Sequence, residues 1–335
     1  MKEYRLSQPA SMEGLKLHER DTPAPGPFQV LVRVRAASIN FKDLMVIGNF
    51  FPVKDGLVPF SDAAGEVVAI GEGVTLVKVG DRVATNYMQR WIAGELQPEH
   101  MGSDLGGSLD GVLADHVLLG EHGVTRVPDH LSWEEAATLP CAGLTAWSAL
   151  IAGHALEPGQ TVLTLGTGGV SIFVLQFAKL FGARVISTTS SDEKADQLKT
   201  LGADAVINYK AMPDWDAEVM KLTDGRGVDR VVEVGGPATF SKSIASVRVG
   251  GSVSAVGGVA GFEGSISPFS LMLKVATVNA IVVGSAERFA AMARAIGANA
   301  MRPVVAKTIP FENAADAYAE LQSARHVGKI VVTGM

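Results

Sequence analysis

Residues 161–171 read Thr-Val-Leu-Thr-Leu-Gly-Thr-Gly-Gly-Val-Ser, and they join a short β-rich run to a helical apolar pattern over 170–181. Glycines at such a junction allow a tight turn and let a pyrophosphate approach the backbone, and the start of the helix then binds its charge. A glycine triplet alone is a weak signal, but its position between strand and helix is more specific. The stretch predicts a βαβ unit that binds a dinucleotide.

The chain changes character near Pro128, where strand-like runs begin to alternate with segments of helical spacing. The strand candidates are 161–166, 183–189, 204–208, 229–234, 251–256 and 278–284. Strands joined by crossover helices predict a doubly wound parallel Rossmann sheet, so we expect the α/β class. Between the second and third of these strands, Asp192 is expected to cap a helix that Gly202 closes.

The first 125 or so residues are β-rich by period and turn signals. Gln29–Ser38, Ala64–Ile70 and Val112–Leu119 are strand candidates, and the glycine-rich stretch Tyr87–Gly111 is a long loop of the kind that is often functional. The chain closes with an apolar strand candidate, Lys329–Val332. The pattern predicts a β-rich domain beside the α/β one.

The composition excludes several classes of protein. Among 335 residues, 29 are basic and 35 acidic, and the net charge of −6 comes without a basic run, so nucleic acid is not an expected partner. The single cysteine, Cys141, excludes an internal disulfide framework and a four-cysteine zinc site. We see neither a signal peptide nor a membrane span, and therefore expect a cytoplasmic protein without a membrane partner.

The residues after the second Rossmann strand bear on the choice of cofactor. A preference for NAD requires a carboxylate there, about 20 residues past the glycines, that accepts a hydrogen bond from the ribose 2′-hydroxyl. The strand ends instead in Thr188-Thr189-Ser190-Ser191, followed by Lys194, and these groups suit a 2′-phosphate. Asp192 and Glu193 are close, but carboxylates are also favoured in the first turn of a helix. We expect NADPH as the cofactor, with NADH as the alternative. If Lys194 does not bind the cofactor, it is an exposed lysine of a helix.

Several motifs follow one another in order along nearly the whole chain. They are Val-Arg-Ala-Ala-Ser-Ile-Asn-Phe-Lys-Asp (34–43), Ala-Gly-Glu-Val-Val-Ala-Ile-Gly-Glu-Gly-Val (64–74), Gly-Asp-Arg-Val (80–83), Ala-Ala-Thr-Leu-Pro-Cys-Ala-Gly-Leu-Thr-Ala (136–146), the glycine turn, Ala-Asp-Ala-Val-Ile-Asn-Tyr (203–209) and Gly-Lys-Ile-Val (328–331). Together they resemble the medium-chain dehydrogenase/reductase superfamily, and within it the zinc-independent quinone oxidoreductase-like branch. The resemblance implies a GroES-like, partly open barrel of residues 1–127 and 287–335, a Rossmann domain of 128–286, and a nicotinamide held between them.

The resemblance also bears on a metal. Relatives with zinc use a cysteine, a histidine and a further cysteine or acid, and the matching positions here are Asn40, Ser61 and Cys141. Asn and Ser are poor zinc ligands, and Asp62 beside Ser61 would not complete a site. The lobe that carries structural zinc in those relatives matches Tyr87–Gly111, which has no cysteine. We expect no metal.

Single residues take roles from the same resemblance. The candidate cofactor-binding residues are Gly166, Thr167, Gly168, Gly169, Val170, Ser190, Lys194, Tyr209, Gly235 and Gly257. Thr145 matches a residue that backs the nicotinamide, and Asn40 matches a polar residue at the mouth of the reaction site, so both are candidate catalytic residues. Phe50 stands where some enoyl reductases of this branch carry a tyrosine proton donor.

The chemistry that remains is hydride transfer to an acceptor that spreads the incoming charge itself. A quinone or an α,β-unsaturated carbonyl does so, and needs only a held nicotinamide, exclusion of water and a hydrogen bond to its oxygen. Asn40 could donate that bond, or its side chain could cap its own turn. We therefore expect an NADPH-dependent, metal-free reductase of such a small-molecule substrate.

Two other functions stay open, and so does the oligomeric state. One is an alcohol or aldehyde dehydrogenase of the same superfamily, and the other is a non-catalytic NADPH-binding sensor or interaction protein. The apolar run Val278–Ser285 ends the expected sheet, and relatives extend the sheet across two subunits there. A homodimer is therefore implied, in keeping with the need of an apolar edge strand for a partner.

Overall fold

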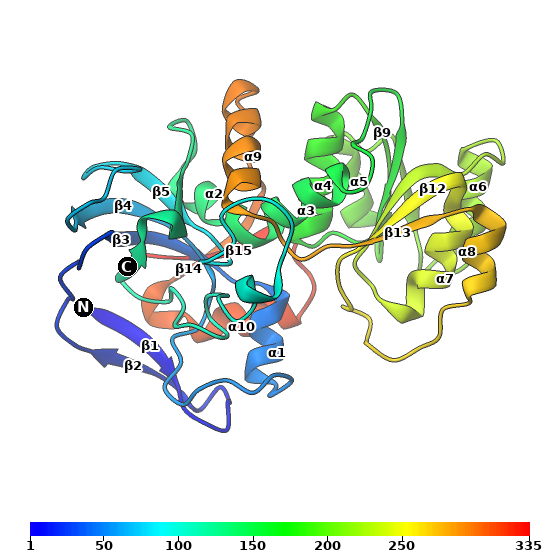
Figure 1. Cartoon of the computed structure of the whole chain (residues 1–335). Helices are drawn as coiled ribbons and strands as arrows, with labels where there is room; N and C mark the ends of the chain where they lie inside the picture. Colours follow the sequence, from blue (N-terminus) through cyan, green and yellow to red (C-terminus); the bar gives the residue numbers. More distant parts are fainter. The chain divides into compact units, whose positions relative to one another are not determined.

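The computed structural model describes residues 1–335 and divides into two compact units (Figure 1). Unit 1 comprises Met1–Leu144 and Gly284–Met335, and unit 2 comprises Thr145–Val283. The sequence predicts a first boundary at 127/128, whereas residues 128–144 group with unit 1 in the structure. The reason is that α2 (Trp133–Ala137) packs on two strands of the unit 1 sheet, β3 and β4.

A seven-stranded sheet forms the frame of unit 1. Its strands are β3 (Gln29–Ser38), β4 (Asp62–Ile70), β5 (Arg82–Thr85), β6 (His116–Gly120), β7 (Val124–Arg126), β14 (Val305–Pro310) and β15 (Lys329–Thr333). They run in the order β14-β15-β3-β4-β5-β7. β6 pairs with residues 29–33 of β3, on the same edge where β15 pairs with residues 36–38. β1 (Lys2–Leu6) and β2 (Leu15–Glu19) form a separate antiparallel pair.

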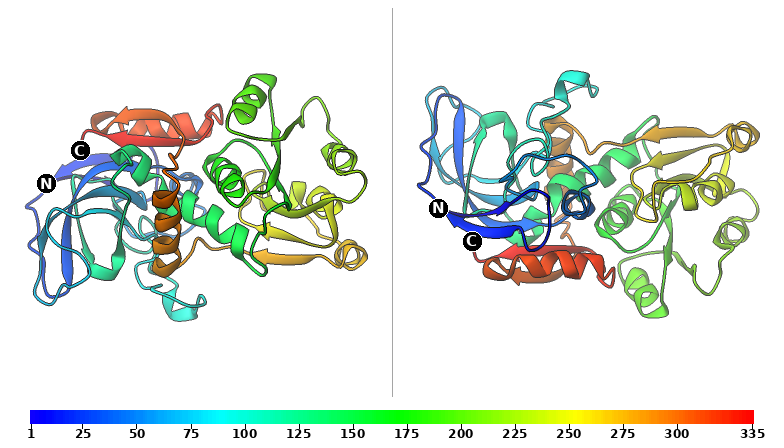
Figure 2. Two further views of the ribbon diagram at one scale, coloured as in Figure 1. Left: turned by 90° about the horizontal axis from the view of Figure 1, so that it is seen from above. Right: turned by 90° about the horizontal axis from the view of Figure 1, so that it is seen from below.

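The two ends of the chain meet in this sheet. β15 pairs antiparallel with β3, with Val331 opposite Ser38. β3 in turn pairs antiparallel with β4, with Ser38 opposite Asp62. Both views of Figure 2 show the red C-terminal segment beside the blue N-terminal one. This pairing brings the first residues of β4 and β15 next to the end of β3.

Short helices cover the unit 1 sheet and its core. They are α1 (Phe41–Ile47), α2, α9 (Ala286–Ala298) and α10 (Ala315–Gln322), with the π-helical turn η3 (Leu139–Gly143) and the 3₁₀ turns η1 (Pro98–His100), η2 (Glu121–Gly123) and η4 (Phe311–Asn313). Phe60 is fully buried in the core and packs on Tyr318 of α10, with ring centroids 5.7 Å apart. The Ser132 hydroxyl accepts from Glu135 N–H and the Glu135 carboxylate accepts from Ser132 N–H, which fixes the start of α2.

A six-stranded parallel sheet forms unit 2, as the sequence predicts. Its strands are β8 (Thr161–Thr164), β9 (Arg184–Thr189), β10 (Ala205–Asn208), β11 (Val228–Glu233), β12 (Val247–Ala255) and β13 (Thr277–Ala280). They run in the order β10-β9-β8-β11-β12-β13, so the strand order reverses between β8 and β11. In such sheets ligands bind beyond the carboxyl ends of the strands at that point.

The helices of unit 2 follow these strands. They are α3 (Leu144–Ile151), α4 (Gly169–Leu180), α5 (Asp192–Thr200), α6 (Trp215–Leu222), α7 (Pro237–Ser246) and α8 (Pro268–Lys274). One expectation was wrong: Asp192 is the first residue of α5, and Ser191 caps it by accepting from Lys194 N–H. The shorter serine side chain stands in extended backbone one residue earlier, where its oxygen can reach the third helical N–H. Gly202 closes the helix at φ +102°.

None of the helices combines the length and apolar character that a bilayer-spanning helix requires.

Candidate active site

The glycine turn of unit 2 exposes its backbone. α4 begins at Gly169, and its N-cap, Gly168, has no side chain to occupy the free N–H groups. Gly166 has φ +76°, which favours glycine, and a Cβ added at Gly166 or Gly168 would meet no atom within 4 Å. The turn thus presents bare backbone and the positive end of α4, as a pyrophosphate requires.

Buried hydroxyls hold this turn from the sheet side. Ser171 Oγ donates to Leu165 O at 2.6 Å, and Gly166 N–H donates to Thr188 Oγ1 at 3.2 Å. Thr167 is buried at the turn and Val170 is half-buried one residue into the helix. Ser171, which stands where relatives have a third glycine, therefore fits the turn and also stabilises it.

The end of β9 gathers hydroxyl and cationic side chains. Ser190 and Lys194 are half-buried, and Tyr209 is anchored by its N–H, which donates to Thr189 O at 2.9 Å. Burial, and then repulsion from the Lys210 ammonium, lowers the pKa of Lys194. Sequence reasoning missed Lys210, although it directly follows Tyr209. Two neighbouring ammonium groups make this an anion-attracting corner of unit 2.

Two carboxylates, Asp192 and Glu193, lie near this corner in the first turn of α5, a position that favours a carboxylate without any ligand. Asp192 accepts from Asn208 Nδ2 at 2.8 Å. Glu193 is exposed, and its charge partly opposes the lowering of the Lys194 pKa.

A buried acid, Glu233, holds the loop that follows β11. Its Oε1 accepts from Gly235 N–H at 2.6 Å, from Gly236 N–H at 3.1 Å and from Thr239 Oγ1 at 2.7 Å, and Oε2 accepts from Ser243 Oγ. Sequence reasoning missed Glu233 as well; the signal was an acid at the end of a buried strand. These bonds fix the backbone of Gly235.

Gly235 and Gly257 lie on the loops after adjacent strands. Gly257 follows β12, and a Cβ there would lie 3.3 Å from Val234 O. At Gly235 a Cβ would lie 2.3 Å from Thr239 Oγ1. At Gly235, therefore, only glycine fits without displacing a neighbour. As glycines, Gly235 and Gly257 both leave the loops beyond the carboxyl ends of β11 and β12 without a side chain at these positions.

Unit 1 contains a second set of buried polar groups where β3, β4 and β15 meet. Asn40 follows β3, Ser61 precedes β4, and Lys329 begins β15; their exposed fractions are 7%, 1% and 4%. Lys329 Nζ donates to Ile39 O and to Asn40 Oδ1, both at 2.5 Å. Asn40 Nδ2 donates to Ser61 Oγ at 3.4 Å, and Ser61 Oγ donates to Asp62 Oδ1 at 2.6 Å.

The Asn40 side chain does not cap its own helix. Asp43 provides the cap instead, because its Oδ2 accepts from Asn40 N–H at 2.8 Å. Burial raises the pKa of Asp43 to about 6, partly offset by this hydrogen bond. The amide of Asn40 is therefore engaged by Lys329 and Ser61 rather than by the turn.

Cys141 lies beside the same network. Its N–H donates to Asp62 Oδ2 at 2.9 Å. Burial, and then the Asp62 carboxylate, raises the pKa of the Cys141 thiol to about 12. The thiol is therefore neutral at physiological pH and is a poor nucleophile.

Thr145, the other candidate catalytic residue, belongs to unit 2. It is the second residue of α3 and is 5% exposed.

Two family models match the chain: an alcohol dehydrogenase GroES-like domain over residues 26–129 and a zinc-binding dehydrogenase domain over 169–298. The chain belongs to the medium-chain dehydrogenase/reductase superfamily. Unit 1 is thus the GroES-like domain and unit 2 the Rossmann domain, which confirms the expected fold class. Membership also confirms an NAD(P)-dependent oxidoreductase.

Relatives within the superfamily carry different names. A zinc-type alcohol dehydrogenase-like protein of Schizosaccharomyces pombe is 39% identical, and the match covers 96% of each chain. The crystal structure of an NAD-dependent alcohol dehydrogenase is 32% identical, with a TM-score of 0.91 over 100% of both chains. A quinone oxidoreductase of Pseudomonas syringae is 28% identical, with a TM-score of 0.84 over 99% of both chains.

Two further relatives bear on cofactor and reaction. A mycobacterial protein whose structure was solved with NADPH is 26% identical, with a TM-score of 0.82 over 100% of both chains. An acryloyl-coenzyme A reductase of Metallosphaera sedula is 29% identical over 96% of this chain and 97% of its own.

The catalytic zinc of some superfamily members does not suit the residues of this chain. No group of three or more His, Cys, Asp and Glu side chains is arranged to hold a metal ion. The matching positions hold an amide, a hydroxyl and a single thiol, and an ammonium is bonded directly to the amide. Zinc requires imidazole, thiolate or carboxylate ligands, and a buried cation beside Asn40 would repel it.

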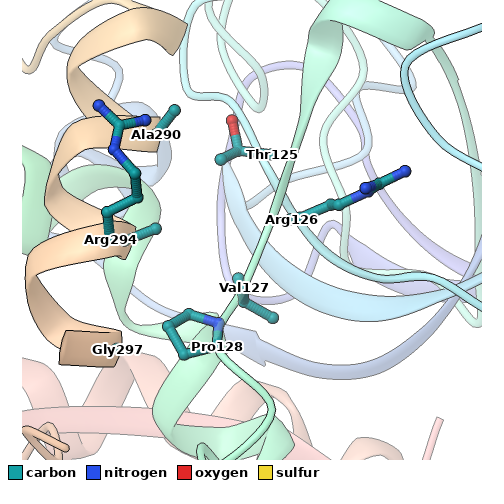
Figure 3. A pocket seen from close by; sticks show the side chains of 8 residues that line it. Thr125, Arg126, Val127, Pro128, Ala290, Arg294 and Gly297 are labelled. Carbon is teal, nitrogen blue, oxygen red and sulfur yellow. The ribbon is translucent and has the colours of Figure 1, made fainter.

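A groove of about 390 Å³ elsewhere in unit 1 carries none of the candidate residues. It lies between β7 and α9 and is lined by Thr125, Arg126, Val127, Pro128, Ala290, Ala293, Arg294 and Gly297. In Figure 3 the guanidinium groups of Arg126 and Arg294 point in different directions. Arg126 pairs instead with Asp81 at 2.8 Å. The groove therefore lacks converging polar groups.

Proposed function

We propose that this chain is an NADPH-dependent, metal-free reductase that transfers hydride to a quinone or an α,β-unsaturated carbonyl. The observation that carries the proposal is the Lys329–Asn40–Ser61–Asp62 network, which stands where zinc members of the superfamily have their ligands. Without a Lewis acid, no metal ion lowers the pKa of a simple alcohol so that its proton can leave. A conjugated acceptor needs less, because the charge spreads over its own oxygen.

The choice of NADPH is supported by the anion-attracting corner of unit 2. Lys194 and Lys210 repel one another there, and a 2′-phosphate would relieve that repulsion. The two carboxylates nearby, Asp192 and Glu193, lie in the first turn of α5 rather than at the end of β9, and Asp192 accepts from Asn208. The NADPH-bound mycobacterial relative points the same way.

NADPH, when bound, supplies the hydride. The glycine turn and the N-terminus of α4 hold the pyrophosphate, and the loop fixed by Glu233 keeps side chains away from the end of β11. Asn40 Nδ2 donates to the substrate oxygen, where negative charge develops. Thr145 contributes a buried hydroxyl at the start of α3.

The purified protein should oxidise NADPH when a quinone or an enone is added, followed at the absorbance of the reduced cofactor. The rate should not change after dialysis against a strong chelator, because no residue set here holds a metal. Loss of activity with the chelator, restored by zinc, would contradict the metal-free proposal.

A second candidate is alcohol oxidation, which the names of the Schizosaccharomyces pombe relative and the NAD-dependent structure favour. The same preparation should be offered a primary alcohol with NADP or NAD. Steady turnover of the alcohol, with none of the quinone or enone, would favour this second function.

We also infer a homodimer formed through unit 2. β13 is the edge of the six-stranded sheet and has a partner on one side only. The neighbouring helix α8 leaves Phe269, Met272 and Leu273 each more than 60% exposed. Such an apolar surface beside an open edge fits a second copy of the chain. Light scattering should give about twice 35.1 kDa, and a monomer mass at micromolar concentration would refute the inference.

A further inference from the structure

Lys329 is an unusual residue to bury. It is 4% exposed, and its neighbours in β15, Ile330, Val331 and Val332, are apolar and buried. Burial lowers the pKa of its ammonium, while the Asp62 carboxylate opposes that change. An apolar side chain of similar length would avoid the cost of desolvating a charge. The lysine therefore needs a reason beyond packing.

The hydrogen bonds of Lys329 determine which way the Asn40 amide faces. An ammonium can only donate, so the amide atom 2.5 Å from Nζ must be Oδ1. The amide nitrogen then faces away from Lys329, toward Ser61 Oγ. Ser61 cannot reverse this arrangement, because its hydroxyl hydrogen is committed to Asp62 Oδ1 at 2.6 Å. A cation at one end and a carboxylate at the other set the direction of every bond between them.

The Asn40 amide nitrogen carries two hydrogens, and both lie on the side away from Lys329. Ser61 Oγ takes one of them at 3.4 Å, and hydrogen bonding from the Asn40 side chain also partly offsets the rise in the pKa of Asp62 that burial causes. The bond from the Lys329 ammonium to Oδ1 also draws electron density from the amide, which makes Nδ2 a stronger donor. The network therefore holds a polarised N–H in a fixed orientation.

We propose that Lys329 is a positioning residue that fixes the Asn40 amide with its nitrogen toward the oxygen of the substrate. This inference rests on the proposed function, in which Asn40 donates to that oxygen. Lys329 brings a fixed positive charge to a place where zinc-containing relatives have their metal, but it acts through the amide and does not touch the substrate.

A double-mutant cycle on kcat tests the proposal. Lys329→Met keeps the length of the side chain and removes its charge, and it should lower kcat about 10- to 100-fold, less than the full loss of a donor to developing negative charge. Asn40→Ala should lower kcat by at least as much. In the Asn40→Ala background Lys329→Met should have no further effect, because the group it positions is gone. The Kd for NADPH should change little throughout, since the residues proposed to hold its pyrophosphate and 2′-phosphate lie in unit 2.

A control and a second variant separate positioning from folding. Lys307→Met on the adjacent strand β14 removes an exposed lysine that pairs with Glu320, and it should leave kcat unchanged. Lys329→Gln keeps a neutral donor that can reach Asn40 Oδ1, so it should recover part of kcat. Thermal unfolding shows whether each variant is folded under the assay conditions, and Lys329→Gln serves if Lys329→Met does not fold.

Two outcomes would overturn the inference, and they differ. In the first, Lys329→Met lowers kcat by the same factor in the wild-type and the Asn40→Ala backgrounds, while Asn40→Ala alone lowers kcat as expected. Lys329 would then not act through Asn40, and the proposed function would stand. An unchanged kcat in Asn40→Ala would remove the role of Asn40 itself, and both proposals would fall.

Discussion

Replacing Lys194 by alanine should weaken NADPH binding much more than NADH binding. The Lys194 side chain is half-buried at the end of β9, and its pKa is lowered by burial and by the Lys210 ammonium. A 2′-phosphate bound there would stabilise both ammonium groups. NADH brings no charge to this corner, so its affinity should change by less than about twofold.

The size of the effect follows from the two lysines. A hydrogen bond to a charged group is worth about 1.5–3 kcal/mol, and every 1.4 kcal/mol changes a dissociation constant about tenfold. Because Lys210 remains to hold part of the phosphate charge, the lower half of that range applies. We expect the Kd for NADPH to rise about 10- to 30-fold.

The assay is a titration of the enzyme with each reduced cofactor, followed by nicotinamide fluorescence. Lys199→Ala is the matched control, because this lysine lies on the same helix, is exposed and pairs with Asp196 at 3.4 Å. The difference between wild type and Lys194→Ala should shrink as salt is added. Equal weakening of NADPH and NADH would refute the phosphate role, and with it the preference for NADPH.

Three further predictions concern buried groups. Burial would raise the pKa of Asp229, but two arginines and the Thr161 N–H lower it from 3.8 to about 2. Asp229→Asn should therefore lower the free energy of unfolding, measured with urea at pH 7, by about 2 kcal/mol. This difference should be lost as the pH falls through 2. A cost that persisted at pH 2 would contradict this assignment. Glu233→Gln should lower the free energy of unfolding by about 1–3 kcal/mol and weaken NADPH binding, because a neutral amide oxygen accepts more weakly from Gly235 and the amide NH2 cannot accept from Ser243. An unchanged Kd would show that the loop does not depend on the charge of Glu233. Because the pKa of Cys141 is about 12, its alkylation at pH 8 should be about a thousandfold slower than that of free cysteine. If Cys141 in the folded protein reacted as fast as free cysteine, the thiol would not be shielded.

Local patterns predicted the elements of unit 2 because each is set by neighbours in the chain. Alternation of apolar runs and helical spacing gave the parallel sheet, and the glycines at 166–169 marked the start of α4. The errors are small and local. Ser191 rather than Asp192 caps α5, and the last strand stops at Ala280, earlier than its apolar run suggested. Both residues at the cap are good N-caps, so the choice depends on backbone geometry.

The network in unit 1 could not be found in this way. Asn40 was a candidate from the sequence, but its partner Lys329 lies 289 residues further along the chain. Within its own stretch Lys329 is a lysine at the beginning of an apolar strand, which is an ordinary surface pattern. Only the pairing of β15 with β3 shows that the strand is internal and that the lysine is buried. Lys210 was missed for a similar reason, since the lysine it acts on, Lys194, belongs to another element. Glu233 differs, because all its partners lie within ten residues and an acid at the end of a buried strand was a usable local signal.

The position of β15 has a consequence for biosynthesis. β3 lies between β15 and β4, and β15 is translated after all of unit 2. On the ribosome, therefore, the continuous Rossmann segment can complete its core while the amino-terminal half of the other sheet still lacks its neighbour. During that interval β6 covers residues 29–33 of this edge of β3, but residues 36–38 have no partner there, and this short open strand end is available for pairing with another chain.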